Sequence, residues 1–81
     1  MMRSYFVALA FIRTEGDILP GDAVECPNAV DAALQAEVLS HEAGSIGAVA
    51  YSRTANDVGV FSEAVIIKKF GDVPTDLSML F

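Results

Sequence analysis

Two segments of this chain, residues 4–14 and 45–54, place apolar side chains on both sides of any strand that they form. They read SYFVALAFIRT and SIGAVAYSRT. Alternate side chains of a strand point to opposite faces, so a sheet with one face in water shows an apolar–polar alternation. Neither segment alternates in this way. The sequence therefore predicts two central strands in a sheet that needs cover on both faces.

The remaining sequence supplies two shorter strands. Residues 15–22, EGDILPGD, combine Gly, Pro and Asp and are expected to form a loop, which leads into a short strand over residues 23–26. A turn is expected at residues 55–59, and a fourth strand at residues 61–70.

One long helix is expected between the second and third strands. Residues 29–43 contain neither Pro nor Gly and are rich in Ala, which has the highest helix propensity. Asn28 follows Pro27 and is a good N-cap, and Asp31 suits the positive end of the helix. Gly44 is a typical helix terminator.

These elements predict an α+β fold in a single domain spanning residues 1–81. The order is ββαββ, with a four-stranded antiparallel sheet in the order 2-1-3-4 and the helix on one face. The two strands with apolar residues on both sides are central for that reason.

The sequence also contains an internal match. Residues 8–17, ALAFIRTEGD, and residues 48–57, AVAYSRTAND, agree at five of their ten positions. One interpretation is the duplication of a strand–strand–helix unit, and the other is convergence of two strand-to-turn junctions on common residues. In either case an antiparallel pairing of the two copies places Arg13 and Arg53 at opposite ends of the sheet.

The helix has two apolar stripes. Small residues dominate the first, which consists of Ala32, Ala36, Leu39 and Ala43, and a second stripe of Val30, Leu34 and Val38 lies roughly opposite. Small side chains permit close approach, so the first stripe is predicted to pack on the sheet face that carries Ala8, Ala10, Ala48 and Ala50. The other sheet face then remains a large apolar surface, which is typical of an interface.

A short chain has little core, and oligomerisation is a common source of added stability. A single cysteine excludes an internal disulfide. We therefore predict a homodimer through the second sheet face, with the C-terminal tail at its rim or crossing to the partner. The expected interface residues are Leu9, Phe11, Val49, Tyr51, Leu77, Leu80 and Phe81. The alternative is that the tail folds back over this face within one chain.

The net charge of −6 disfavours nucleic acid and anionic membrane surfaces as partners. No apolar run is long enough to span a membrane. The apolar stretch near the N-terminus stops at Ile12 without a small-residue cleavage site, so no signal peptide is expected. A cytoplasmic location is the resulting prediction.

Few residues suggest chemistry. Arg13 and Arg53, with Tyr51, could hold an anionic ligand, because guanidinium groups grip carboxylate or phosphate bidentately. The alternative is that each arginine pairs with a turn carboxylate such as Asp17 or Asp57.

His41 and Cys26 have simple explanations. His41 lacks partners at metal-ligand spacing, so a solvated or dimer-facing role is expected. Cys26 lies near the start of the helix, where a thiol can be reactive, but a small buried apolar side chain is the favoured role. No catalytic residue, metal or cofactor is predicted.

Two resemblances are present. The segments GAVAYSRT and KKFGDVP resemble a family of small uncharacterised bacterial proteins, which implies no particular activity. The segment CPNAVDAALQAEVL is similar to the strand-to-helix junction of small antitoxin domains with a strand–strand–helix–strand core. The chain lacks the partner-facing or DNA-binding extension of those antitoxins.

These features favour a small acidic homodimeric protein-interaction module without catalytic activity. The alternative is a small-molecule binder or minor enzyme, with its site between the sheet and a dimer mate. A third possibility is an antitoxin-like regulator, which the charge disfavours.

Overall fold

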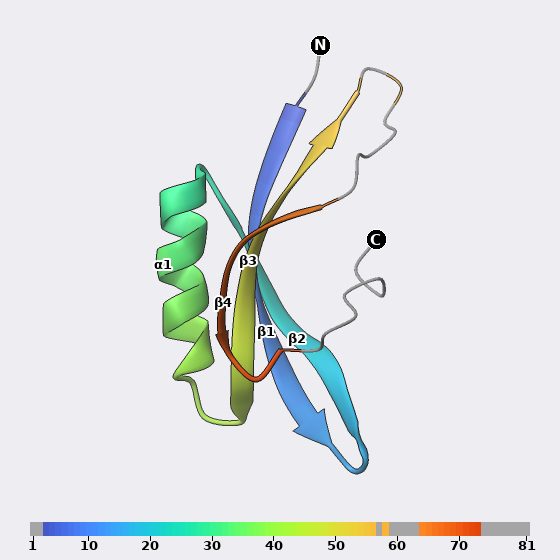
Figure 1. The fold of residues 1–81 in the computed structure, drawn as a ribbon, viewed down its shortest axis with the longest axis vertical. Helices are drawn as coiled ribbons and strands as arrows, with labels where there is room; N and C mark the ends of the chain where they lie inside the picture. Colours follow the sequence, from blue (N-terminus) through green and yellow to red (C-terminus); the bar gives the residue numbers. More distant parts are fainter. Residues whose placement is uncertain (1–2, 57, 59–63, 74–81) are drawn as a thin grey trace.

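A sheet of four antiparallel strands with one helix on one face makes up the computed structural model, which describes residues 3–56, 58 and 64–73 (Figure 1). The elements in chain order are β1 (Arg3–Thr14), β2 (Asp17–Cys26), α1 (Ala29–Ser40), β3 (Ser45–Ala55) and β4 (Val65–Gly71). The strand order is β2-β1-β3-β4. The predicted α+β fold and its topology are therefore confirmed.

The second strand is longer than the sequence predicts. It begins at Asp17, opposite Thr14, so a two-residue turn replaces the predicted loop. Gly16 in this turn has a φ of 76°, a conformation that glycine adopts without strain. Pro20 lies within β2 because β2 is an edge strand, where a missing N–H can face away from the ladder. The register with β1 also shifts next to it, between Leu9 and Phe11.

The helix begins where the sequence predicts and ends earlier. The Asn28 side-chain oxygen accepts a hydrogen bond from the backbone N–H of Asp31 at 2.8 Å, which confirms the cap. The helix ends at Ser40 instead of residue 43. The backbone N–H groups of His41 and Glu42 donate hydrogen bonds to carbonyls three residues earlier, instead of the four residues of an α-helix. Gly44, with a φ of 86°, then leads into β3.

The fourth strand begins at Val65, later than the predicted residue 61, and residues 61–63 lie outside the described part of the chain. In the described residues no helix is both long and apolar enough to cross a membrane.

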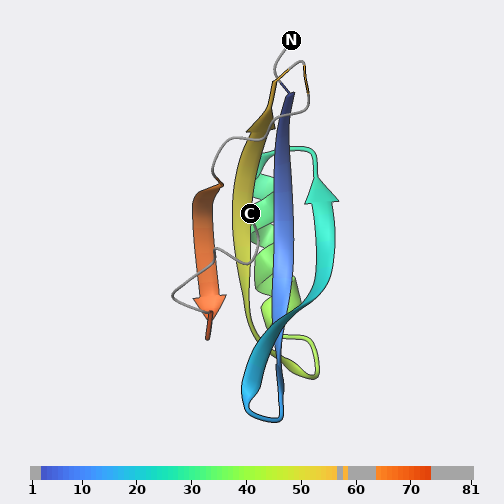
Figure 2. The ribbon, with the colours of Figure 1, turned by 90° about the vertical axis from the view of Figure 1, so that its right-hand side faces the viewer.

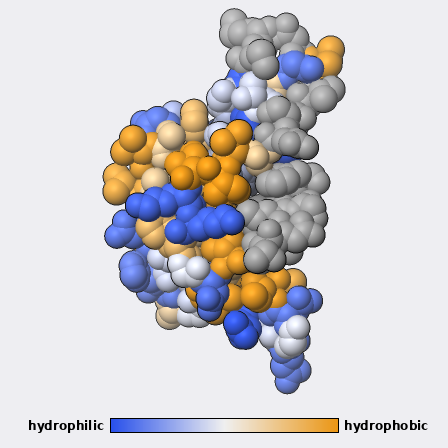
Figure 3. Space-filling view, in the orientation of Figure 1, coloured by the Kyte–Doolittle hydropathy of each residue, from blue (hydrophilic) through white to orange (hydrophobic). Residues whose placement is uncertain are grey.

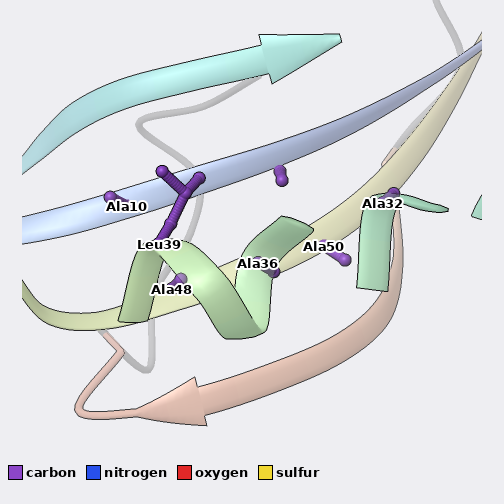
Figure 4. Packing of buried hydrophobic residues seen from close by; sticks show 7 residues of the cluster. Ala10, Ala32, Ala36, Leu39, Ala48 and Ala50 are labelled. Atoms are coloured by element: carbon purple, nitrogen blue, oxygen red, sulfur yellow. The ribbon is translucent and has the colours of Figure 1, made fainter. Parts of the chain in front are cut away.

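The helix packs on the sheet through alanines on both sides of the contact. The buried cluster consists of Ala8, Ala10, Ala32, Ala36, Leu39, Ala48 and Ala50 (Figure 4). Leu39 supplies the large side chain of this cluster, and Phe6, Val24, Ile67 and Phe70 pack at its margins. The predicted helix face is therefore confirmed, except that Ala43 is exposed beyond the end of α1.

A second cluster lies on the opposite face of the sheet. Phe11 and Val49 are fully buried and Leu9 is 5% exposed. Ile46 joins them because β3 bulges there: Phe11 pairs with Gly47 and Ile12 with Ser45, which leaves Ile46 as the extra residue. Both faces of the central strands are therefore apolar, as predicted. Figure 2 shows these strands between β2 and β4, with α1 behind them.

Gly47 is required by the close approach of the chain after β4. A Cβ atom at this position would overlap the carbonyl oxygen of Asp72 and lie 2.7 Å from that of Phe70. The Asp72 N–H donates to the carbonyl of Ile46 at 2.9 Å in the same place. The end of β4 is thus held against the bulge of β3 by backbone contacts that leave no room for a side chain.

The pairing of β1 with β3 relates the two copies of the internal sequence match by a local twofold axis. Ala8 faces Ala50 and Ala10 faces Ala48, so a local twofold axis near Leu9 exchanges the two copies. This register agrees with duplication, which stays a hypothesis beside convergence.

We expect Ala36→Leu to lower the free energy of unfolding by about 1–3 kcal/mol, because the helix and sheet leave no space for added methylene groups. The matched control is Ala33→Leu, since Ala33 borders an open groove and the change should stay within about 0.5 kcal/mol. Urea unfolding followed by circular dichroism measures both variants. Equal effects at the two positions would contradict the close-packed contact.

Candidate protein-interaction surface

The outer face of α1 carries large aliphatic side chains that are more than half exposed. Val30, Leu34 and Val38 recur every fourth residue and are 69%, 58% and 56% exposed. We call these three residues the α1 ridge. The ridge points outward because the alanine face of the same helix is the one that packs on the sheet. Contiguous exposed apolar patches of this kind mark interaction sites.

A groove lies between the α1 ridge and β4. Its volume is about 270 Å³, and its walls include Val30 and Leu34 from the helix and Ile67 and Phe70 from β4. Lys68 borders the groove and holds its ammonium nitrogen 5.2 Å from the centre of the Phe70 ring, within cation–π range. In the orientation of Figure 3, hydrophobic surface gathers over the upper part of α1 and over β4.

This groove depends on a bulge in β4. Tyr51 pairs with Ile66 and Ala50 with Lys68, which leaves Ile67 as the extra residue. Ile67 consequently packs on the helix side of the sheet, while Ile66 packs on the opposite side.

A second groove lies between the α1 ridge and β2. It has a volume of about 350 Å³ and is lined by Leu34 and Val38 together with Val24 and Cys26. Glu25 and Asp31 border it and bring negative charge to its margin. The ridge is thus flanked by a groove on each side.

The charges of the chain are segregated around this surface. Residues 15–44 hold seven of the eleven acidic residues and none of the five Lys and Arg. The seven are Glu15, Asp17, Asp22, Glu25, Asp31, Glu37 and Glu42, and all of them are exposed. The basic residues lie on the other three strands, with Lys68 and Lys69 on β4. The helix and the edge strand β2 therefore carry acidic but no basic side chains.

The structure does not bring the two predicted arginines together. Arg13 pairs with Ile18 near the β1–β2 turn, whereas Arg53 pairs with Tyr5 at the opposite end of the sheet. The expected separation of the two arginines is confirmed, and their role in binding an anion stays a prediction.

Tyr51 lies on the same sheet face as Arg53 and is half-buried. Burial raises the pKa of the Tyr51 hydroxyl, and the positive charge of Arg53 partly opposes the rise.

Two turn carboxylates are the predicted alternative partners of the arginines. The Asp17 carboxylate accepts a hydrogen bond from the backbone N–H of Ile18 at 3.1 Å. Asp57 lies outside the described residues.

Cys26 has the environment of a structural thiol. It is half-buried against the alanine cluster, and its sulfur donates to the carbonyl of Val24 at 3.6 Å. Burial, followed by the negative charge of Asp31, raises the pKa of the Cys26 thiol, although a backbone hydrogen bond from Ala8 opposes this. The thiolate is the reactive form, so the environment suppresses the reactivity that a helix N-terminus can confer.

His41 is the C-cap residue of α1 and is exposed. Within the described residues, no three His, Cys, Asp or Glu side chains gather in a way that could hold a metal ion.

The predicted interface residues have different positions in the structure. Leu9, Phe11 and Val49 are buried within the single chain, while Tyr51 remains half-exposed. Leu77, Leu80 and Phe81 lie outside the described residues. The sequence pattern identifies the stripe of the α1 ridge, but it does not identify the grooves, because these depend on how the helix lies across the two edge strands and on the β4 bulge.

No family model, curated protein or solved structure matches this chain. The two sequence resemblances therefore stay predictions.

We expect Cys26 to react with iodoacetamide more slowly in the folded protein than in the urea-unfolded protein at the same pH. The reason is the raised thiol pKa, which lowers the thiolate fraction at every pH below it. Rates measured across a pH series should show a higher apparent pKa in the folded state, and Asp31→Asn should lower it. Cys26→Ser should keep the fold and serves as the control for reaction at groups other than the thiol. A folded-state rate above the unfolded one would show an activated thiol instead.

Proposed function

We propose that this chain is a small protein-interaction module without catalytic activity, that it acts in the cytoplasm, and that it contacts its partner through the α1 ridge. The observation that carries the proposal is the exposure of Val30, Leu34 and Val38 on one continuous helix face. A helix that only covers a sheet normally turns polar side chains to water. Large aliphatic residues at this spacing are instead the anchors of helix-mediated recognition.

The residues that attach the helix to the sheet are not those of the ridge. The helix is attached to the sheet through Ala32, Ala36 and Leu39, whose side chains are buried. Val30, Leu34 and Val38 keep more than half of their surface in contact with water, so they add less to stability than the buried residues of the same helix. Burial against a partner would gain roughly 25 cal/mol for each Å² of apolar surface removed from water. This contrast supports a surface that serves binding.

The homodimer expected from the sequence remains part of the proposal. A domain of this size gains stability from association, and identical patches pair most simply about a twofold axis. Of the predicted sheet-face contacts, Tyr51 is the described side chain that a second copy can reach, because Leu9, Phe11 and Val49 are buried.

The first test introduces a photo-crosslinking amino acid at position 34 in cells that produce the protein. We expect covalent adducts at this position, because the ridge is occupied in the cell. The matched control is position 19, where Leu19 is 42% exposed on β2 away from the ridge and should give none. If position 34 gives no adduct above the control, the proposed interaction surface is wrong.

The second test addresses the homodimer. Sedimentation equilibrium at micromolar concentration should give about twice the chain mass of 8.6 kDa, and Tyr51→Asp should shift the protein toward the monomer. A variant at an exposed position outside this face, Leu19→Asp, serves as the control. A monomer at all concentrations would refute the homodimer and leave the ridge proposal to the crosslinking result.

A further inference from the structure

We infer that the occupant of the α1 ridge is an amphipathic helix of another protein, with an apolar face bordered by Lys or Arg. This inference assumes the proposed function and names the chemistry of the partner. It combines two features of the surface, namely the shape of the apolar centre and the sign of the charge around it.

The apolar centre fits a helix. The ridge follows the i, i+4 row of α1, and such rows pack into the grooves beside the matching rows of a second helix. The ridge has a groove on each side, one toward β4 with mostly apolar walls and one toward β2 with apolar and polar side chains in its walls. Large side chains of a partner helix can enter these grooves while Leu34 fills the space between them.

The charge around the centre selects a basic partner. Glu25 and Asp31 border the groove beside β2, and Glu37 borders the groove beside β4. The segment that contains all three has no Lys or Arg of its own. Lys68, from β4, is the cation that the described residues place at a groove margin, and it lies over the Phe70 ring. The surface thus has an apolar centre and a mainly acidic rim.

A second copy of this chain matches the rim less well. Two copies docked ridge to ridge bring the carboxylates of both helices close together, and like charges facing each other across an interface disfavour the complex. A partner helix with basic margins gains from the same carboxylates, and electrostatic attraction also speeds its association.

The probe is a short synthetic helix, labelled with a fluorophore, that has leucines at i, i+4 and i+8 and lysines on both margins. Fluorescence anisotropy with the full chain should give saturable binding that weakens as salt is raised. Two peptides act as controls: one has the same composition in scrambled order, and one has glutamate in place of each lysine. Both should bind at least about tenfold more weakly, which corresponds to about 1.4 kcal/mol.

Variants of the chain separate the two features. Leu34→Ser should weaken binding of the probe at least about tenfold, as expected for a central anchor, and Leu19→Ser should not change it. The double variant with Glu25→Gln and Glu37→Gln should bind the probe about two- to fivefold more weakly, and its binding should depend less on salt. Circular dichroism and thermal unfolding verify that each variant is folded, which is expected because all these side chains are exposed.

The outcomes are distinguishable. Absence of binding by the probe, or equal binding by the scrambled or the glutamate peptide, overturns the inference. An adduct at position 34 that contains a second copy of this chain also overturns it, while the proposed function still stands. Absence of any adduct at position 34 contradicts both this inference and the proposed function.

Discussion

The contact between two alanine-lined surfaces determines how the rest of this protein is arranged. Ala32 and Ala36 of α1 meet the alanines of β1 and β3, so the helix approaches the sheet closely. The helix has a second apolar stripe, but its larger side chains would hold the two layers apart and forfeit these contacts. Close packing through the small residues therefore turns the α1 ridge toward water.

One helix covers only one face of a sheet that is apolar on both. The opposite face has its own cluster around Phe11 and Val49. Two bulges distribute side chains between the faces: Ile46 joins the second cluster, and Ile67 joins the helix side. A bulge changes the face on which the following residues lie, and this is how the edge strand β4 comes to form one wall of a groove.

Packing and charge together produce the proposed binding surface. The ridge has the apolar character of an anchor, and its surroundings have the charge of a rim. The segment from residue 15 to residue 44 forms both β2 and α1, so the helix and the strand beside one of its grooves carry negative but no positive charge. The proposed specificity for a basic partner follows from this excess of negative charge, since apolar contact alone does not discriminate among amphipathic helices.

The sequence by itself determined the features that depend on spacing along the chain. The Asn28 cap, the alanine stripe of the helix and the two-sided central strands all follow from local patterns, and they were sufficient to predict the topology. The tertiary structure alone decided the rest. Pro20 lies in a strand because β2 is an edge, α1 ends at Ser40 as the chain turns into β3, and Ile67 faces the helix because of a bulge. These features arise from pairings between residues far apart in the chain, and periodicity within one segment carries no information about its neighbours in space.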